Sequence, residues 1–214
     1  MLGRWQEAIE SYERAIAIDP SRHDLWTLKG DLCCKLDRFE EAIECHDAAL
    51  ERYPDEILGW EYRGFALASL GRHEEALQSY DKHIAVFPQS SAAWYYKGNS
   101  LCHTGDFEAA IHCYDKAIEL DPYYSGSWLN KGNCLARLGK SGWSEVALSC
   151  YEGAAVRANP PEALGWYNMA LVQERLGRNR DAIRSYEKFV AAAPSHLNAS
   201  AAHERVQNLK SKRE

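Results

Sequence analysis

The sequence predicts an all-α fold in which pairs of antiparallel helices recur every 34 residues and stack on one another. Three periodic features predict it: a proline, a tryptophan six residues later, and a small residue four residues after the tryptophan. The first two recur at a spacing of 34 residues, at Pro20, Pro54, Pro88 and Pro122 and at Trp26, Trp60, Trp94 and Trp128. Such a period is the signature of a repeat architecture, because a single helical pair cannot bury its own apolar face.

The unit over residues 91–124 shows how each repeat is built. A first helix is predicted by three residues that share one helical face: Trp94, Gly98 and Leu101. A second helix is predicted by another apolar stripe, which comprises Phe107, Ala110, Ile111, Tyr114 and Ala117. Gly105 separates the two helices. The second helix ends at Asp121, because the following Pro122 cannot continue the hydrogen-bond ladder.

Small and aromatic residues predict where the two helices of a pair cross. The small residue of the first helix is Gly30, Gly64, Gly98, Gly132 and then Ala170. The second helix has its own small residue, at Ala8, Ala42, Ala76, Ala110, Ala147 and Ala182. Four residues further on stand Tyr12, His46, Tyr80, Tyr114, Tyr151 and Tyr186. We expect the helices to approach closely at the small residues, with the aromatic rings filling the space around the crossing.

The period orders the elements along the chain. Residues 1–22 supply a second helix without its first, and 197–214 form a terminal helix. Between them lie the full repeats 23–56, 57–90, 91–124, 125–162 and 163–196. The terminal helix combines a polar face with an apolar stripe formed by Ala199, Ala202, Val206 and Leu209, as a capping helix needs. We therefore expect a single array over 1–214.

Repeat 125–162 is four residues longer than the others. Three extra residues enter the turn at 139–143, and one enters before Pro160. Either this turn is an exposed loop with a function and carries Trp143 at its tip, or it is a neutral length variant in which Trp143 packs as Phe107 does.

These residues resemble the tetratricopeptide repeat family over essentially the whole chain. The resemblance implies an α-solenoid, a right-handed superhelix in which first helices line the concave face. It further implies a non-catalytic protein–protein interaction module that binds a peptide or a helix of a partner protein in the concave groove. A pentatricopeptide interpretation fits less well, since the period is 34 rather than 35 and the chain is acidic.

The resemblance assigns the concave groove to defined positions of each first helix. The candidate peptide-binding residues are Tyr62, Phe65, Tyr95, Tyr96, Asn99, His103, Asn130, Asn133, Arg137, Tyr167, Asn168 and Arg175. Aromatic side chains there provide contact area, amides can pair with a peptide backbone, and the cations can attract acidic residues. Each type has an alternative: aromatics of which some pack between neighbouring first helices, solvated amides, and cations that complement the helix dipole.

Other classes of function are disfavoured by composition and motifs. A formal net charge of −6 argues against nucleic acid as a partner. No apolar run reaches the roughly 18–20 residues of a membrane span, and no secretion signal is visible. We expect no catalytic residues, no cofactor and no metal. Gly139-Lys140-Ser141 lacks the earlier glycine and the strand of a phosphate loop.

Seven cysteines, an odd number without a C-x-x-C pair, predict free thiols in a reducing compartment, hence a cytoplasmic location. Cys45, Cys113 and Cys150 stand where other repeats have serine, which favours packing at a close helix contact over a metal or redox site.

Two alternatives to groove binding stay open. The half repeat 1–22 would leave an apolar flank formed by Trp5, Ile9, Tyr12 and Ile16 partly uncovered, so the chain could self-associate as an assembly scaffold. It could also be a regulatory array cut from a larger signalling protein or enzyme.

Overall fold

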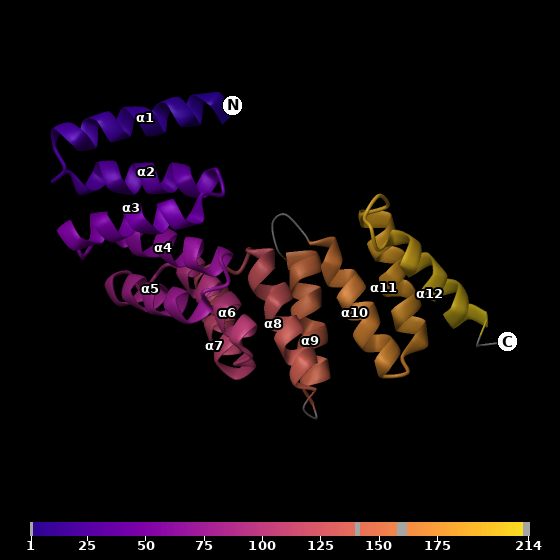
Figure 1. Cartoon of the computed structure of the whole chain (residues 1–214). Coiled ribbons are helices and arrows are strands. Elements are labelled where there is room, and N and C mark those ends of the chain that lie inside the picture. The colour runs from indigo at the N-terminus through magenta and orange to yellow at the C-terminus, as the bar shows by residue number, and fades with distance from the viewer. Residues whose placement is uncertain (1, 140–141, 158–161, 212–214) are drawn as a thin grey trace. The chain divides into compact units, whose positions relative to one another are not determined.

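The computed structural model describes residues 2–139, 142–157 and 162–211. The regular elements within these ranges are all helices (Figure 1), which confirms the predicted all-α class. The chain divides into two compact units, 1–106 and 107–214, and the division falls between the two helices of the predicted repeat 91–124. That one array spans the chain stays a prediction.

In the first unit each helix packs against the next one along the chain, and first helices of neighbouring repeats, α2 with α4 and α4 with α6, also touch. The helices are α1 (Leu2–Ile18), α2 (His23–Lys35), α3 (Phe39–Arg52), α4 (Ile57–Ser69), α5 (His73–Val86) and α6 (Ser91–Thr104).

The second unit follows the same scheme, with α8 also touching α10. Its elements are α7 (Phe107–Leu120), α8 (Ser125–Leu138), α9 (Trp143–Glu152), the π-helical segment η1 (Gly153–Arg157), α10 (Ala163–Arg175), α11 (Asn179–Ala192) and α12 (Ala199–Ser211). Across both units, first helices begin at the residues where the full repeats were predicted to begin: His23, Ile57, Ser91, Ser125 and Ala163.

The recurring proline and tryptophan are joined by a hydrogen bond. In four repeats the indole Nε1–H of the tryptophan donates to the carbonyl oxygen of the proline six residues earlier. The N···O distances are 3.2 Å for Trp26 to Pro20, 2.7 Å for Trp60 to Pro54, 3.0 Å for Trp94 to Pro88 and 2.8 Å for Trp128 to Pro122. This hydrogen bond thus joins the start of each of these four first helices to the turn before it.

The close helix crossing predicted at the glycines is confirmed. A Cβ placed on Gly64 would lie 2.6 Å from the ring of Tyr80, and one on Gly132 would lie 2.6 Å from the ring of Tyr151. At Gly30 the neighbour is the His46 imidazole, at 2.7 Å. The small residues of the second helices are buried as well, with no exposed surface at Ala42, Ala76, Ala110, Ala147 and Ala182.

The long repeat accommodates part of its excess in a π-helix. After Glu152 the backbone continues as η1, which packs against α8, α9 and α10, although the sequence predicted only a longer connection here. The i→i+5 pattern takes more residues per turn than an α-helix, so it absorbs an inserted residue without ending the helix. Trp143 begins α9, is half-buried and packs against the core of the second unit, as the length-variant interpretation expects. Lys140 and Ser141 lie outside the described residues.

Ion pairs between consecutive repeats form a ladder that sequence reasoning did not identify. In four repeats a cation three residues after the tryptophan contacts an acidic residue 16 positions earlier, on the preceding second helix. The pairs are Lys29–Glu13 at 2.9 Å, Arg63–Asp47 at 2.5 Å, Lys97–Asp81 at 2.5 Å, and Lys131–Asp115. Both members recur every 34 residues, so the same periodicity could have revealed them. In the last repeat the residue three positions after the tryptophan is the uncharged Met169, so the series of ion pairs ends there.

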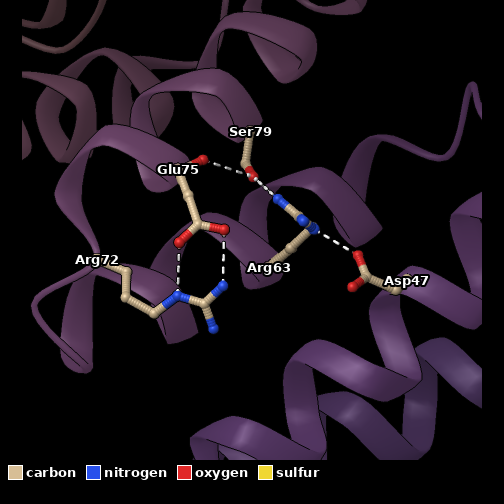
Figure 2. A network of polar contacts seen from close by, with 5 residues as sticks. All are labelled: Asp47, Arg63, Arg72, Glu75 and Ser79. Carbon is tan, nitrogen blue, oxygen red and sulfur yellow. Dashed lines mark hydrogen bonds and ion pairs between the residues drawn. The ribbon is translucent and has the colours of Figure 1, made fainter.

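Arg63 does more than pair with one carboxylate. Figure 2 shows its guanidinium between Asp47 of α3 and Ser79 of α5, with Nη1 donating to the Ser79 hydroxyl over 2.8 Å. Ser79 has no exposed surface. Nearby, Arg72 binds Glu75 through two hydrogen bonds of 2.6 Å, at the protein surface.

Replacing Arg63 with methionine is expected to lower the free energy of unfolding by about 1–2 kcal/mol, because Asp47 loses its cation and the buried Ser79 hydroxyl loses a donor. Urea denaturation measures the change. Arg72→Met is the matched control and should leave stability unchanged, since an exposed ion pair contributes little. Equal losses of unfolding free energy for both substitutions would contradict a stabilising role for the hydrogen bonds from Arg63 to Asp47 and Ser79.

The cysteines divide into two groups. Cys33, Cys34, Cys45, Cys113 and Cys150 are buried thiols, which agrees with the packing role expected for the last three. The prediction of free thiols is wrong for Cys102 and Cys134, each of which is disulfide-bonded. The cysteines therefore give no support to a reducing compartment.

The two ends of the chain differ in how well they are covered. Ile9 and Ile16 of α1 are buried, and Trp5 and Tyr12 are half-buried, so less of this flank is open than expected. On α12 all four residues of the predicted apolar stripe are buried, and Ala202, Val206 and Leu209 belong to a core cluster of the second unit.

Candidate functional site

A cavity of about 280 Å³ opens between the first helices of the first unit. Three of the predicted groove residues line it: Tyr62 and Phe65 of α4, and Tyr96 of α6. The rest of the lining is polar or charged and comes from Asp31, Cys34, Lys35 and Glu61. The structure thus brings aromatic side chains from two repeats to one hollow, and that these residues bind a peptide stays a prediction.

The aromatic walls of this cavity support one another. The rings of Phe65 and Tyr96 meet edge to face, with centroids 6.1 Å apart, and Tyr96 also stacks on the buried Tyr80. Behind Tyr62 lies the buried imidazole of His46, nearly parallel to it with the centroids 5.8 Å apart. Contacts of this kind hold the rings in place without a ligand.

The other predicted residues of this unit lie outside the lining of the cavity. Tyr95 is half-buried, and its ring meets the edge of Tyr96 at 5.3 Å. Asn99 is half-buried on the same helix, α6. His103, near the end of α6, is exposed and stacks on His73 with the centroids 4.4 Å apart. Their roles in binding stay predictions.

A second cavity, of about 510 Å³, lies in the second unit between α8, α9 and α10. Four predicted residues line it: Asn133 and Arg137 of α8, and Asn168 and Arg175 of α10. Its remaining lining is Ala136, Tyr151, Leu171 and Val172. This lining contains two guanidinium groups and no carboxylate.

Hydrogen bonds orient the amides of the second cavity. The Tyr151 hydroxyl and the Nδ2–H of Asn168 both donate to Oδ1 of Asn133, each over 3.0 Å. Because the Asn133 oxygen accepts both bonds, its amide nitrogen keeps its donors for another partner. Tyr151 belongs to a second helix, so groove positions drawn from first helices alone did not include it.

The structure does not bring Asn130 and Tyr167 into the lining of this cavity. Asn130 is half-buried on α8. Tyr167 packs against Tyr186 and Phe189 of α11, a second helix, with ring centroids 5.7 and 5.1 Å apart. Groove binding by either residue stays a prediction.

Family models identify the repeat independently of the geometry. Models described as tetratricopeptide repeat match residues 91–124, 1–61 and 113–145, and a further one matches both 34–91 and 140–196. The chain belongs to the tetratricopeptide repeat (TPR) family. The match to 91–124 has the boundaries of the repeat derived above from the proline and tryptophan periods.

Solved TPR structures share the fold at low sequence identity. YrrB, described as a TPR protein with an unusual peptide-binding site, is 20% identical with a TM-score of 0.73, over 92% of this chain and 99% of its own. PilW, a type IV pilus biogenesis factor, is 20% identical with a TM-score of 0.78, over 94% and 92%. MamA from Desulfovibrio magneticus RS-1 is 19% identical with a TM-score of 0.65, over 70% and 82%. No curated protein matches the sequence.

The described part of this TPR chain contains neither a candidate membrane-spanning helix nor a candidate metal-binding cluster. None of its helices is both long and apolar enough to cross a membrane. Among the same residues, no group of three histidine, cysteine or acidic side chains is arranged to hold a metal ion.

Proposed function

We propose that this chain is a non-catalytic interaction module that binds a peptide segment or a helix of a partner protein on the face formed by its first helices. The cavity lined by Tyr62, Phe65 and Tyr96 carries the proposal. Half-buried aromatic side chains around a hollow provide large contact area at low entropic cost, which is how interface hot spots are built.

The second cavity supports the same function with different chemistry. The amide nitrogen of Asn133 can donate to the backbone carbonyl of a bound segment, while the guanidinium groups of Arg137 and Arg175 can contact its acidic side chains. The description of YrrB as a protein with a peptide-binding site is in line with this proposal.

Self-association through α1 is the alternative. The half-buried Trp5 and Tyr12 support it, whereas Ile9 and Ile16 are already covered. Analytical ultracentrifugation of the wild type and of Trp5→Ala separates the two proposals. A dimer that Trp5→Ala abolishes would favour the scaffold, whereas a monomer in both samples would favour the groove. A cytoplasmic location belongs to the proposal as well, and cell fractionation tests it.

Affinity purification from the source cells tests groove binding. The wild type, the triple variant Tyr62→Ala, Tyr95→Ala and Asn99→Ala, and a control with Glu51→Gln on the exposed surface of α3 are compared in parallel. Circular dichroism first confirms that all three are folded. We expect the triple variant to lose partners that the control retains. If every partner is retained by the triple variant, this face is not the binding surface.

A further inference from the structure

We propose that the cavity of the first unit receives a positively charged side chain, a lysine or an arginine of the bound segment. This inference rests on the proposed function, because it names the chemistry of the ligand at the same surface. The supporting observation is that the lining of one cavity combines aromatic side chains with more carboxylates than ammonium groups.

The walls present the surface that a cation prefers. Tyr62, Phe65 and Tyr96 contribute three aromatic rings to one cavity, and a cation is attracted to the face of such a ring by its quadrupole. The aliphatic stem of a lysine or arginine can pack on the same rings while its charged end reaches the polar side of the lining. A volume of about 280 Å³ suits one long side chain rather than a whole helix, whose diameter is about 10–12 Å.

The charges of the lining favour a cation. Asp31 and Glu61 supply two carboxylates, and Lys35 supplies the single ammonium group, whose Nζ lies 2.6 Å from Oδ2 of Asp31. Within the described residues Glu61 has no lysine or arginine partner, and the ring nitrogen Nε2 of His83 lies 3.7 Å from its Oε2. One negative charge is therefore in excess, at a half-buried carboxylate that faces aromatic rings.

The remaining lining groups add no positive charge. Burial raises the pKa of the Cys34 thiol to about 12, so it stays neutral at pH 7. Burial, followed by the nearby carboxylates Asp31 and Glu61, raises the pKa of the Tyr62 phenol, and burial with Glu61 does so for Tyr96. After burial, the carboxylates Asp31 and Glu61 at Tyr62 and Glu61 at Tyr96 act in the direction that favours a cationic side chain, while Lys35 opposes them at Tyr62.

The second cavity provides an internal contrast. Its lining contains Arg137 and Arg175 without a carboxylate, so it repels the side chain that the first cavity attracts. A lysine or arginine anchor on a bound segment is therefore directed to the first unit.

Substitution of Lys35 tests whether the bound side chain is positively or negatively charged. Its ammonium neutralises Asp31 from within the lining, so Lys35→Met leaves two uncompensated carboxylates and keeps most of the aliphatic stem. Binding of a cationic segment should then become about three- to tenfold tighter. Glu61→Gln should weaken it by about five- to tenfold, since the cation loses its carboxylate partner while the aromatic rings stay in place. An acidic ligand would show the opposite sign in both variants.

The experiment uses peptides as the probe. A random 12-residue library is selected on the whole wild-type chain, and the enriched peptides are synthesised with a fluorescent label. Each lysine or arginine is replaced in turn by norleucine, and the dissociation constant is measured by anisotropy against the wild type, Glu61→Gln, Lys35→Met and the control Glu51→Gln. Thermal denaturation verifies that each variant is folded.

We expect one lysine or arginine whose replacement raises the dissociation constant about tenfold for the wild type and for Glu51→Gln, but less than about twofold for Glu61→Gln. Peptides that bind without depending on a lysine or arginine, or whose dependence Glu61→Gln does not change, would overturn the inference and leave the proposed function standing. Failure to enrich any peptide would overturn both.

Discussion

Replacing Tyr80 with alanine is expected to lower the free energy of unfolding by about 3–5 kcal/mol, the range for truncating a large buried ring. The ring has no exposed surface and fills the space left by Gly64, where α4 and α5 cross. Chemical denaturation monitored by circular dichroism measures the loss. Tyr80→Phe keeps the ring and should be at least as stable as the wild type, because the buried Tyr80 hydroxyl has no hydrogen-bond partner among the residues that the structure describes.

The fit between Gly64 and Tyr80 can be isolated by a double-mutant cycle. Gly64→Ala alone places a Cβ 2.6 Å from the ring and should cost about 1–3 kcal/mol by overpacking. In the Tyr80→Ala background the same change meets a cavity, so its cost should vanish and the higher helix propensity of alanine should remain. Additive effects of the two substitutions on the free energy of unfolding would show that Gly64 is not required to accommodate the Tyr80 ring.

Lowering the pH from 7 to 5 is expected to remove about 2 kcal/mol of stability through His46 alone. Burial lowers the pKa of this imidazole from 6.5 to about 4, against the opposing effects of Asp31 and Asp47. The unfolded chain therefore takes up a proton between these pH values that the folded chain does not. The contribution of His46 is complete above pH 6.5 and is lost as the pH falls toward 4.

The variant His46→Tyr restores the residue that stands at this position in other repeats, such as Tyr80, and removes the titrating group. Urea denaturation at several pH values should show a shallower loss of stability for His46→Tyr than for the wild type below pH 6.5. His73, whose pKa burial also lowers, is present in both proteins and cancels in the comparison. Parallel pH profiles would contradict a neutral, buried His46.

The repeats were predictable because their period rests on local chemistry. A proline, a tryptophan and a small residue in fixed register are visible in the sequence, and the structure supplies the physical reasons: the hydrogen bond from Trp60 to Pro54 and the contact between Gly64 and Tyr80. The π-helical segment was not predictable, since an inserted residue can enter either a loop or a helix, and only packing against α8 and α10 decides which.

The candidate site was predictable in position more than in chemistry. The family resemblance assigned Tyr62, Phe65 and Tyr96 to the groove, but which side chains fill the core and which line the cavity depends on neighbouring helices. Tyr167 shares the repeat position of Tyr95 and nevertheless packs against Phe189. The charge balance of the lining also required distances, since only the structure pairs Lys35 with Asp31 and leaves Glu61 without a lysine or arginine among the described residues.

Site-specific photo-crosslinking tests groove binding most directly. A photoreactive phenylalanine at Leu28, which is 45% exposed and shares the repeat position of Tyr62, is compared with the same group at the exposed Gln78 of α5. After irradiation in the source cells, we predict a crosslinked partner peptide at position 28 and none at position 78. Crosslinks confined to position 78, or equal at both, would contradict binding on the face of the first helices.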